Sequence, residues 1–392
     1  MSPFFELLQV ALRTRDKLSR VPNAIQWEEM LDESDRQAIT GVMFNGIERL
    51  KKHDERSVDD LSLDLFLEWG VLTHVIEEQS KVMNQRSAEV IRMFEEAGFE
   101  ACVLKGQGNA LMYPTPMRRQ PGDIDVWVRP KRPTVYTDTK DITPADTKRY
   151  FERNRKEILK YVLERIPEVK VKEHHVDYPV YEDTEVEVHF FPMYLKNPFA
   201  MRRLLHLFYK EADEQFTNEV RTATDERLIV PTVRFNVIFQ LVHVYLHYLN
   251  QGIGLRHIVD YFYVLRMFFL EHELSPIDHK SSINKMLKEL HLERFSAAMM
   301  WILKERLGMP EEWMICEADA QEGRRVLKEV MQMGNFGQYD ERISKKLVSG
   351  VKYYWEKVKR QVRLVRLYPQ EVLWDPWWRL ETNFHKFTTN YH

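Results

Sequence analysis

The chain has 392 residues, of which 44% are hydrophobic and 12% aromatic, and its formal net charge at pH 7 is -3. This length favours two or three domains, and the near-neutral charge argues against a protein that coats nucleic acid over its whole surface. Two cysteines, Cys102 and Cys316, give no framework for disulfides or for a zinc finger. No run approaches the ~18 apolar residues of a membrane span and no secretory signal is visible, so we expect a cytoplasmic protein.

The first part of the chain, residues 1–98, is predicted to be helical. Apolar residues recur at helical spacing over 61–76 and again over 82–94. Gly98 then ends the segment, because glycine is favoured just beyond the end of a helix. We therefore expect an N-terminal helical segment.

Residues 99–196 predict a small mixed α/β domain, because short strand-like runs alternate here with helical patterns. Residues 130–145 hold three prolines and no apolar periodicity, which is typical of a loop or insertion. The expected elements are a strand at 99–104, a helix at 109–113, a strand at 123–128, a helix at 146–166 with Asp146 as its N-cap, and strands at 169–180 and 185–191.

Residues 197–392 predict a C-terminal helical domain in which Pro231 opens a long apolar helix. Residues 345–366 are strongly basic, with aromatic and aliphatic residues between the cations. Such a segment predicts an amphipathic helix that contacts nucleic acid or an anionic membrane surface. The alternative is a helix packed on the protein with its basic face in solvent. The tryptophan-rich run 374–378 is expected to anchor this basic, aromatic tail.

Asp123 and Asp125 form the most informative pair in the chain. Side chains alternate along a strand, so this spacing places both carboxylates on one face. Two like charges this close repel unless a cation lies between them, and Mg²⁺ prefers carboxylate oxygens as ligands. An isolated Asp-x-Asp pair also occurs at solvated strand edges. Neighbouring sequence features are therefore needed to distinguish a metal site from an exposed strand edge.

Two neighbouring features favour a metal site that handles phosphates. The Lys-Gly-Gln-Gly loop at 105–108 follows an expected strand, and glycine lets backbone N–H groups approach phosphate oxygens, aided by the N-terminus of the next helix. Arg118 and Arg119 lie just before the aspartate pair, where guanidinium groups can bind phosphates.

A third carboxylate is expected from a later strand. Alternation over 185–191 puts Glu185, Glu187 and His189 on one face and apolar residues on the other. A carboxylate from a neighbouring strand would complete the ligand set of a metal site for phosphoryl chemistry.

Four motifs together carry a resemblance to a known family. They are Leu104-Lys105-Gly106, Tyr113-Pro114, Arg119-x-x-Gly122-Asp123-Ile124-Asp125 and Val186-Glu187-Val188-His189. With them the chain resembles, over roughly residues 85–270, the bacterial uncharacterised nucleotidyltransferase family of the polymerase-β-type superfamily. The resemblance implies an α+β fold, in which a nucleotidyltransferase-like mixed β-sheet core with flanking helices is followed by a helical domain. The superfamily loop usually has Gly or Ser where this chain has Gln107.

The resemblance also implies a chemistry. Asp123 and Asp125 would hold two divalent ions, Mg²⁺ or Mn²⁺, and Glu187 would join one of them, with Glu185 as the alternative. The expected reaction transfers a nucleoside monophosphate from an NTP to an unknown acceptor, which is a small molecule, a protein or an RNA end. The residues expected to bind the nucleotide are Lys105, Gly106, Gly108, Arg118, Arg119 and Arg256.

Two other classes of function stay open. One is a catalytically inactive nucleotide-binding scaffold or regulatory protein that keeps the fold. The other is an adaptor that binds nucleic acid or a membrane surface through the basic segment 345–366.

Histidines raise one further alternative. His243 and His247 share a helix face and could bind a transition metal, but hydrogen-bonded core or cleft histidines are favoured in these apolar surroundings. By the resemblance, Arg256 and these histidines line the substrate cleft. His174 and His175 lie on an expected strand, where a structural role is predicted.

Overall fold

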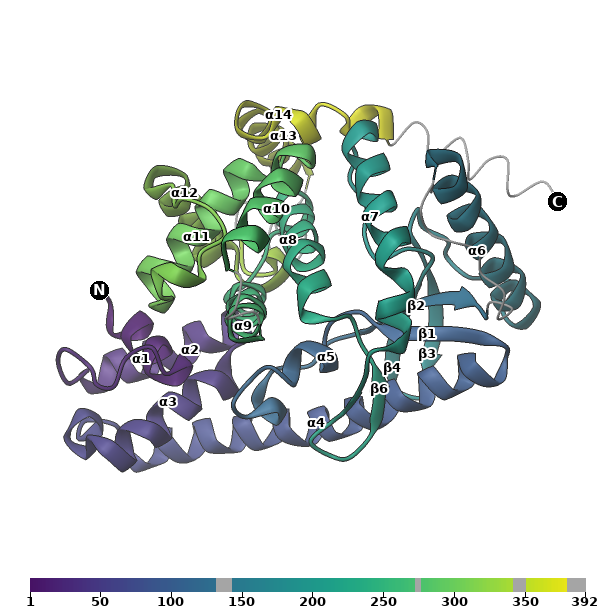
Figure 1. Cartoon of the computed structure of the whole chain (residues 1–392). Coiled ribbons are helices and arrows are strands. Elements are labelled where there is room, and N and C mark those ends of the chain that lie inside the picture. Colours follow the sequence, from purple (N-terminus) through teal and green to yellow (C-terminus); the bar gives the residue numbers. More distant parts are fainter. Residues whose placement is uncertain (132–142, 272–275, 341–349, 379–392) are drawn as a thin grey trace.

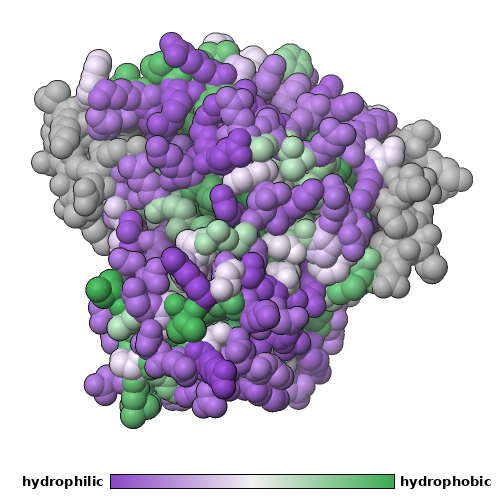
Figure 2. Space-filling model, turned by 90° about the vertical axis from the view of Figure 1, so that its left-hand side faces the viewer, coloured by the Kyte–Doolittle hydropathy of each residue, from purple (hydrophilic) through white to green (hydrophobic). Residues whose placement is uncertain are grey.

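The computed structural model of the chain describes residues 1–131, 143–271, 276–340 and 350–378. The fold is α+β, with helices around one small mixed sheet (Figure 1). The fold class expected from the sequence is therefore confirmed. The face of the molecule drawn in Figure 2 is largely hydrophilic, with scattered hydrophobic residues.

The N-terminal segment is helical, as predicted. Its elements are α1 (Pro3–Leu12), α2 (Ala24–Arg36), α3 (Thr40–His53), the 3₁₀ turn η1 (Glu55–Val58) and α4 (Leu63–Glu96). Helix α4 begins after Ser62, whose side chain accepts a hydrogen bond from the Leu65 N–H, and it runs along the bottom of Figure 1 to the sheet. The chain then turns at Gly98, where a φ of +85° favours glycine.

Four strands form the sheet that carries the candidate site. They are β1 (Phe99–Val103), β2 (Ile124–Pro130), β3 (His175–Tyr181) and β4 (Thr184–His189), in the spatial order β1-β2-β4-β3. Strands β2 and β4 are parallel, whereas β1 pairs antiparallel with β2, and β3 pairs antiparallel with β4. The predicted strands are thus present, although β3 begins later than expected and Asp123 lies just before β2.

The two faces of β2 have different environments. Ile124, Val126 and Val128 belong to an apolar core that they share with α4 and with α6 (Pro144–Arg165). Trp127 belongs to the core on the opposite face, which includes the C-terminal helices. Because side chains alternate along the strand, Asp125 is on the same side as Trp127.

One helix and two short elements connect these strands. Helix α5 (Gln107–Ala110) and the 3₁₀ turn η2 (Pro116–Arg118) lie between β1 and β2, and α6 lies between β2 and β3. The N-cap of α6 is Thr143, which forms a capping box with Asp146, so the prediction of Asp146 as the N-cap is wrong. The reason is Pro144, which occupies the first helical position and leaves the cap to the residue before it. Of the predicted loop 130–145, residues 132–142 lie outside the described residues.

The C-terminal part is mainly helical, with one hairpin that the sequence did not predict. Its elements are α7 (Pro198–Thr217), β5 (Glu219–Arg221), β6 (Arg227–Ile229), α8 (Val233–Asn250), α9 (Leu255–Glu271), α10 (Pro276–Glu289), α11 (Glu293–Leu307), η4 (Glu311–Trp313), α12 (Ala320–Met333), η5 (Asn335–Gly337), α13 (Gly350–Leu367) and α14 (Pro369–Val372). Strands β5 and β6 have three residues each, which is too short for a periodic pattern. Helix α8 begins with Thr232 as its N-cap, close to the start predicted at Pro231.

One hydrophobic core joins the two helical parts of the chain. It includes Leu7 of α1 and Leu307 of α11, and Gln9 Nε2 donates a hydrogen bond to the Arg306 carbonyl at 3.0 Å. The N-terminal segment therefore packs on the C-terminal helices. Domain boundaries at residues 98 and 196 stay a prediction. In the described part of the chain, no helix has both the length and the apolar character needed to cross a membrane.

Candidate active site

A row of three carboxylates crosses the sheet. Asp125 of β2 lies opposite Glu187 of the parallel strand β4, and Glu187 lies opposite Asp177 of β3. In the next row on the same face, His189 of β4 lies opposite His175 of β3. Since side chains two residues apart share a face, carboxylates and imidazoles meet at this end of the sheet.

Asp125 is the most deeply buried of these carboxylates, with 2% of the residue exposed. Lys105 Nζ lies 2.8 Å from Asp125 Oδ2, and His189 Nε2 lies 3.0 Å from Asp125 Oδ1. Burial alone would raise the pKa of Asp125, but the cation of Lys105 and the hydrogen bond from His189 hold it below its usual value. Asp125 is therefore an ionised carboxylate with one partner on each oxygen.

Asp123 lies close enough to Asp125 for the two charges to repel. The negative charge of Asp125 is the main cause that raises the pKa of Asp123, burial raises it further, and Lys105 opposes both. Asp123 is only partly buried, whereas Asp125 is fully buried. Repulsion between the two aspartates, which their spacing led us to expect, is thus present even though Asp123 precedes the strand.

Glu187 bridges the carboxylates and the histidines. His175 Nε2 lies 3.3 Å from its Oε1, and His189 Nε2 lies 3.7 Å from its Oε2. Burial would raise the pKa of Glu187, but hydrogen bonds from His175 and His189 lower it well below its usual range. Ligand atoms of Asp125, Glu187 and His189 all lie within 4.8 Å of one another, so this set could hold a metal ion. The alternative ligand, Glu185, is exposed.

A cleft opens beside the aspartate pair. Its lining includes residues that the sequence predicted to bind metal or nucleotide, namely Lys105, Gly106, Arg119, Asp123, Asp125 and Arg256. Helices α8 and α9 and the turn η5 supply most of the remaining wall, with Gln240, His243, His257, Asp260 and Phe336. The cleft therefore lies between the sheet and the C-terminal helices, and it is lined mainly by polar and charged side chains.

The two buried arginines of the cleft differ in their partners. Two guanidinium nitrogens of Arg119 donate to Asp260, Nε to Oδ1 and Nη2 to Oδ2, each at 2.8 Å. Arg256 Nη1 instead donates to the carbonyls of Gln120 and Pro121, each at 3.2 Å. Among the described residues, no ion pair joins Arg256 to a carboxylate. Arg119 is therefore neutralised by the protein, whereas Arg256 brings a net positive charge.

The structure does not bring Arg118 and Gly108 to the cleft. Arg118 forms ion pairs with Glu48 and Glu77 of the N-terminal helices, the latter at 2.7 Å. A side chain at Gly108 would lie 3.0 Å from Val230, so this glycine allows a close packing contact. Gly106 is the glycine at the turn of the loop, where its φ of +61° and ψ of -109° require a residue without Cβ.

His243 is hydrogen-bonded within the cleft. Its Nε2 lies 3.0 Å from Lys105 Nζ, and because an ammonium group can only donate, Nε2 is the acceptor. Burial and the neighbouring Lys105 hold the pKa of His243 well below its usual value. The ring of His247 lies 4.4 Å from that of His243. These contacts support the interpretation of His243 as a hydrogen-bonded cleft histidine.

Sequence reasoning missed several residues that shape the site. Asp260 holds Arg119 and accepts a 2.5 Å hydrogen bond from the hydroxyl of Tyr113. The sequence did not connect Asp177 and His175 with Glu187. In the structure, Asp177 lies opposite Glu187 on the sheet, and His175 contacts both carboxylates. The spacing of His175 and Asp177, two residues apart on one predicted strand, was the available signal.

The fold and the site together define a class of protein. A carboxylate on each of two neighbouring parallel strands, next to a glycine turn and a cation-lined cleft, is the arrangement expected of a nucleotidyltransferase-like core. The chain belongs to the uncharacterised nucleotidyltransferase family, whose sequence profile matches residues 23–308. The family expected from the motifs is thereby confirmed. No curated protein and no solved structure matches the chain.

Proposed function

We propose that the protein is a metal-dependent nucleotidyltransferase that transfers a nucleoside monophosphate from an NTP to an acceptor. The observation that carries this proposal is the register of β2 and β4, which sets Asp125 opposite Glu187 with Asp123 beside them at the edge of the cleft. Membership of the nucleotidyltransferase family supports it. The acceptor, whether a small molecule, a protein or an RNA end, is left open.

The donor set fits a hard divalent cation. Asp123, Asp125 and Glu187 offer carboxylate oxygens, which suit Mg²⁺ or Mn²⁺, and the raised pKa of Asp123 reflects unneutralised negative charge that a cation would relieve. Held by these carboxylates, such ions would supply charge neutralisation for the triphosphate and activation of the attacking oxygen. The residues of this chain would bind the ions, orient the nucleotide and exclude water from the cleft.

Two cations of the cleft are suited to the phosphates. Lys105 already lies at the aspartates, so a small rotation of its side chain would move its charge from Asp125 toward an entering triphosphate. Arg256 is buried and bonds only carbonyl oxygens among the described residues, which leaves its charge for an anion. We therefore assign nucleotide binding to Lys105, Gly106 and Arg256.

The other arginines and Gly108 take supporting roles in this proposal. Arg119, locked by Asp260, positions the segment that leads into Asp123. Arg118 binds that segment to α3 and α4 through Glu48 and Glu77. A direct phosphate contact from Arg118 would require it to leave both carboxylates.

The test is metal-dependent binding and turnover of labelled NTPs. Wild-type protein is incubated with each NTP and with Mg²⁺ or Mn²⁺ across varied acceptors, and compared with the double variant Asp123→Ala/Asp125→Ala. We expect metal-dependent NTP binding and transfer only in the wild type. The exposed Asp60→Ala variant serves as the matched control. If wild type neither binds nor consumes any NTP, the enzyme proposal fails and a non-catalytic scaffold remains.

An adaptor role through the basic segment 345–366 is the second candidate. On α13, Trp355, Val358 and Val362 recur at helical spacing and are exposed, which supports contact with another surface. Two cations of the segment are already paired, however, because buried Arg360 and exposed Arg363 both bind Glu329. Salt-dependent co-sedimentation with anionic liposomes or RNA, lost on deletion of 345–392, would support the role. We place the protein in the cytoplasm in either case.

A further inference from the structure

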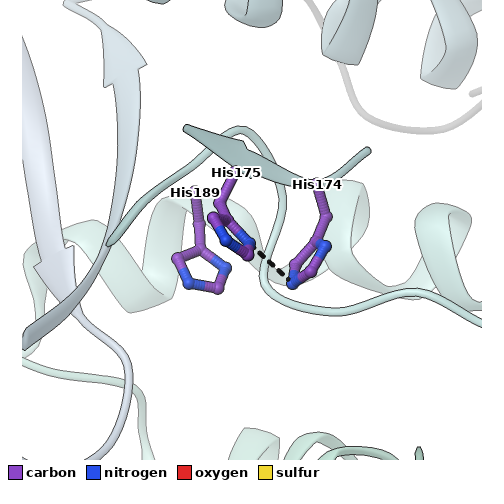
Figure 3. Close-up of side chains that lie close together, drawn as sticks. All are labelled: His174, His175 and His189. Atoms are coloured by element: carbon purple, nitrogen blue, oxygen red, sulfur yellow. Dashed lines mark hydrogen bonds between the residues drawn. The ribbon is translucent and has the colours of Figure 1, made fainter. Parts of the chain in front are cut away.

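Three histidines gather at one end of strands β3 and β4, beside the carboxylate row. His174 directly precedes β3, His175 is the first residue of β3, and His189 is the last residue of β4 (Figure 3). Their ring centroids lie 4.3 to 5.1 Å apart, and one ring nitrogen of each lies within 4.8 Å of the others. His174 Nε2 is 3.0 Å from His175 Nδ1. One nitrogen of each ring thus lies close enough to the others for the three to hold a metal ion.

The cluster is buried and incompletely hydrogen-bonded. The exposed fractions of His174, His175 and His189 are 8%, 3% and 3%. The Nδ1 atoms of His174 and His189 are buried and have no hydrogen-bond partner among the described residues. A buried polar atom without a partner costs free energy, so each such atom needs an explanation. Aromatic rings of Phe191 and Tyr194 lie against His174 and limit access of water.

Carboxylates bind the outer nitrogens of two of these rings. His189 Nε2 lies 3.0 Å from Asp125, and His175 Nε2 lies 3.1 Å from Asp177 and 3.3 Å from Glu187. A histidine that ligates a metal almost always gives its other ring nitrogen to a carboxylate, carbonyl or water. In both residues Nδ1 is the nitrogen that remains, and it lies on the side of the neighbouring imidazoles.

We propose that His174, His175 and His189 form a second metal site, which binds a divalent transition metal of the Zn²⁺ class. Three imidazoles favour such borderline ions over Mg²⁺, which prefers oxygen ligands. Ligation needs a lone pair on each ligating nitrogen, so the proton shared by His174 Nε2 and His175 Nδ1 would move to the unpartnered Nδ1 of His174 or be released, and any proton on His189 Nδ1 would be released. Since His189 also bonds Asp125, the ion would fix the orientation of one proposed catalytic carboxylate.

The site is tested on untagged, full-length protein stripped with a chelator. Co²⁺ is added as a spectroscopic probe, and Zn²⁺ binding is measured by calorimetry with and without excess Mg²⁺. We expect stoichiometric Zn²⁺ uptake that excess Mg²⁺ does not displace, and visible Co²⁺ bands typical of nitrogen ligation. Absence of both, or binding that Mg²⁺ abolishes, overturns the proposal, since the latter outcome points to the carboxylates alone.

Variants separate the histidine site from the proposed transferase site. His174→Ala is expected to abolish the Co²⁺ bands, and Asp177→Asn, which removes an outer carboxylate, to weaken Zn²⁺ binding about 10- to 100-fold. The exposed His74→Ala variant is the control and should bind as wild type. Asp123→Asn should lose nucleotidyl transfer and keep the Co²⁺ spectrum, so the two proposals can fail separately. If His174→Ala does not fold, the melting temperature of wild type with and without Zn²⁺ still tests whether the folded protein binds this ion.

Discussion

Lys105 and Asp125 form a buried ion pair at the floor of the cleft, with 2.8 Å between Nζ and Oδ2. Burial would lower the pKa of Lys105, but the carboxylates of Asp125 and Asp123 raise it above its ordinary value, so the ammonium stays charged. His243 accepts a second hydrogen bond from the same ammonium group. In the proposed enzyme, this cation is the one that an entering triphosphate meets beside the aspartates.

Replacing Lys105 with Met should weaken NTP binding about 10- to 100-fold, because a hydrogen bond to a charged group is worth about 1.5–3 kcal/mol. Lys105→Arg should restore part of the affinity, since the charge is kept but its shape differs. Calorimetric titration of a non-hydrolysable NTP measures the effect. Unchanged affinity in Lys105→Met would remove Lys105 from the nucleotide site.

Asp125→Asn should reduce nucleotidyl transfer about 100- to 1,000-fold or more, the size of effect seen when one preorganised electrostatic group is removed. The substitution keeps the volume of the side chain and removes the charge that attracts the ions. The measurement is kcat/KM in Mn²⁺ and Mg²⁺, with the exposed Asp60→Asn as control. Transfer at the wild-type rate in Asp125→Asn would show that another carboxylate holds the ions.

The sequence was sufficient for the local elements that bear the site. The position of Asp125 between Ile124 and Val126 predicted that its carboxylate lies on the opposite face of the strand from these apolar side chains, because alternation is a local property of a strand. The pairing of Asp125 with Glu187 was also expected, since both lie on predicted strands, although only the resemblance selected Glu187 over Glu185.

Long-range partners were not predictable in the same way. Arg119 lies next to the aspartate pair in sequence, which favoured a phosphate contact, but its partner Asp260 comes from a distant helix. Likewise, Arg118 is held by Glu48 and Glu77 of the N-terminal helices. No local periodicity reports such pairs, because they arise only when helices far apart in the chain pack together.

Arg119→Met should destabilise the protein by about 3–5 kcal/mol, because it leaves Asp260 buried without its cation. The double variant Arg119→Met/Asp260→Leu should recover much of this loss, since it removes the uncompensated charge as well. Urea denaturation, followed by circular dichroism, measures the free energy of unfolding. A single variant that costs less than about 1 kcal/mol would mean that water or Tyr113 satisfies Asp260 without Arg119.

Glu371 should make the stability of the protein fall between pH 4.5 and 7. Burial raises the pKa of Glu371 to about 7, although the backbone N–H groups of Lys196 and Asn197 oppose this. The folded state therefore holds a proton that the unfolded state, with a pKa of 4.5, has already released. Stability from this group is greatest below pH 4.5, decreases as pH rises to about 7, and changes little above.

The expected loss across this window is of order 3 kcal/mol, from about 1.36 kcal/mol for each pKa unit. Glu371→Gln cannot ionise, so its stability should lack this part of the pH dependence, while buried histidines titrate alike in both proteins. Urea denaturation of wild type and Glu371→Gln at pH 5 and pH 8 measures the difference, with the exposed Glu317→Gln as control. Parallel pH profiles for wild type and Glu371→Gln would mean that Glu371 is ionised in the folded protein throughout, held by Lys196 and the N-terminus of α7.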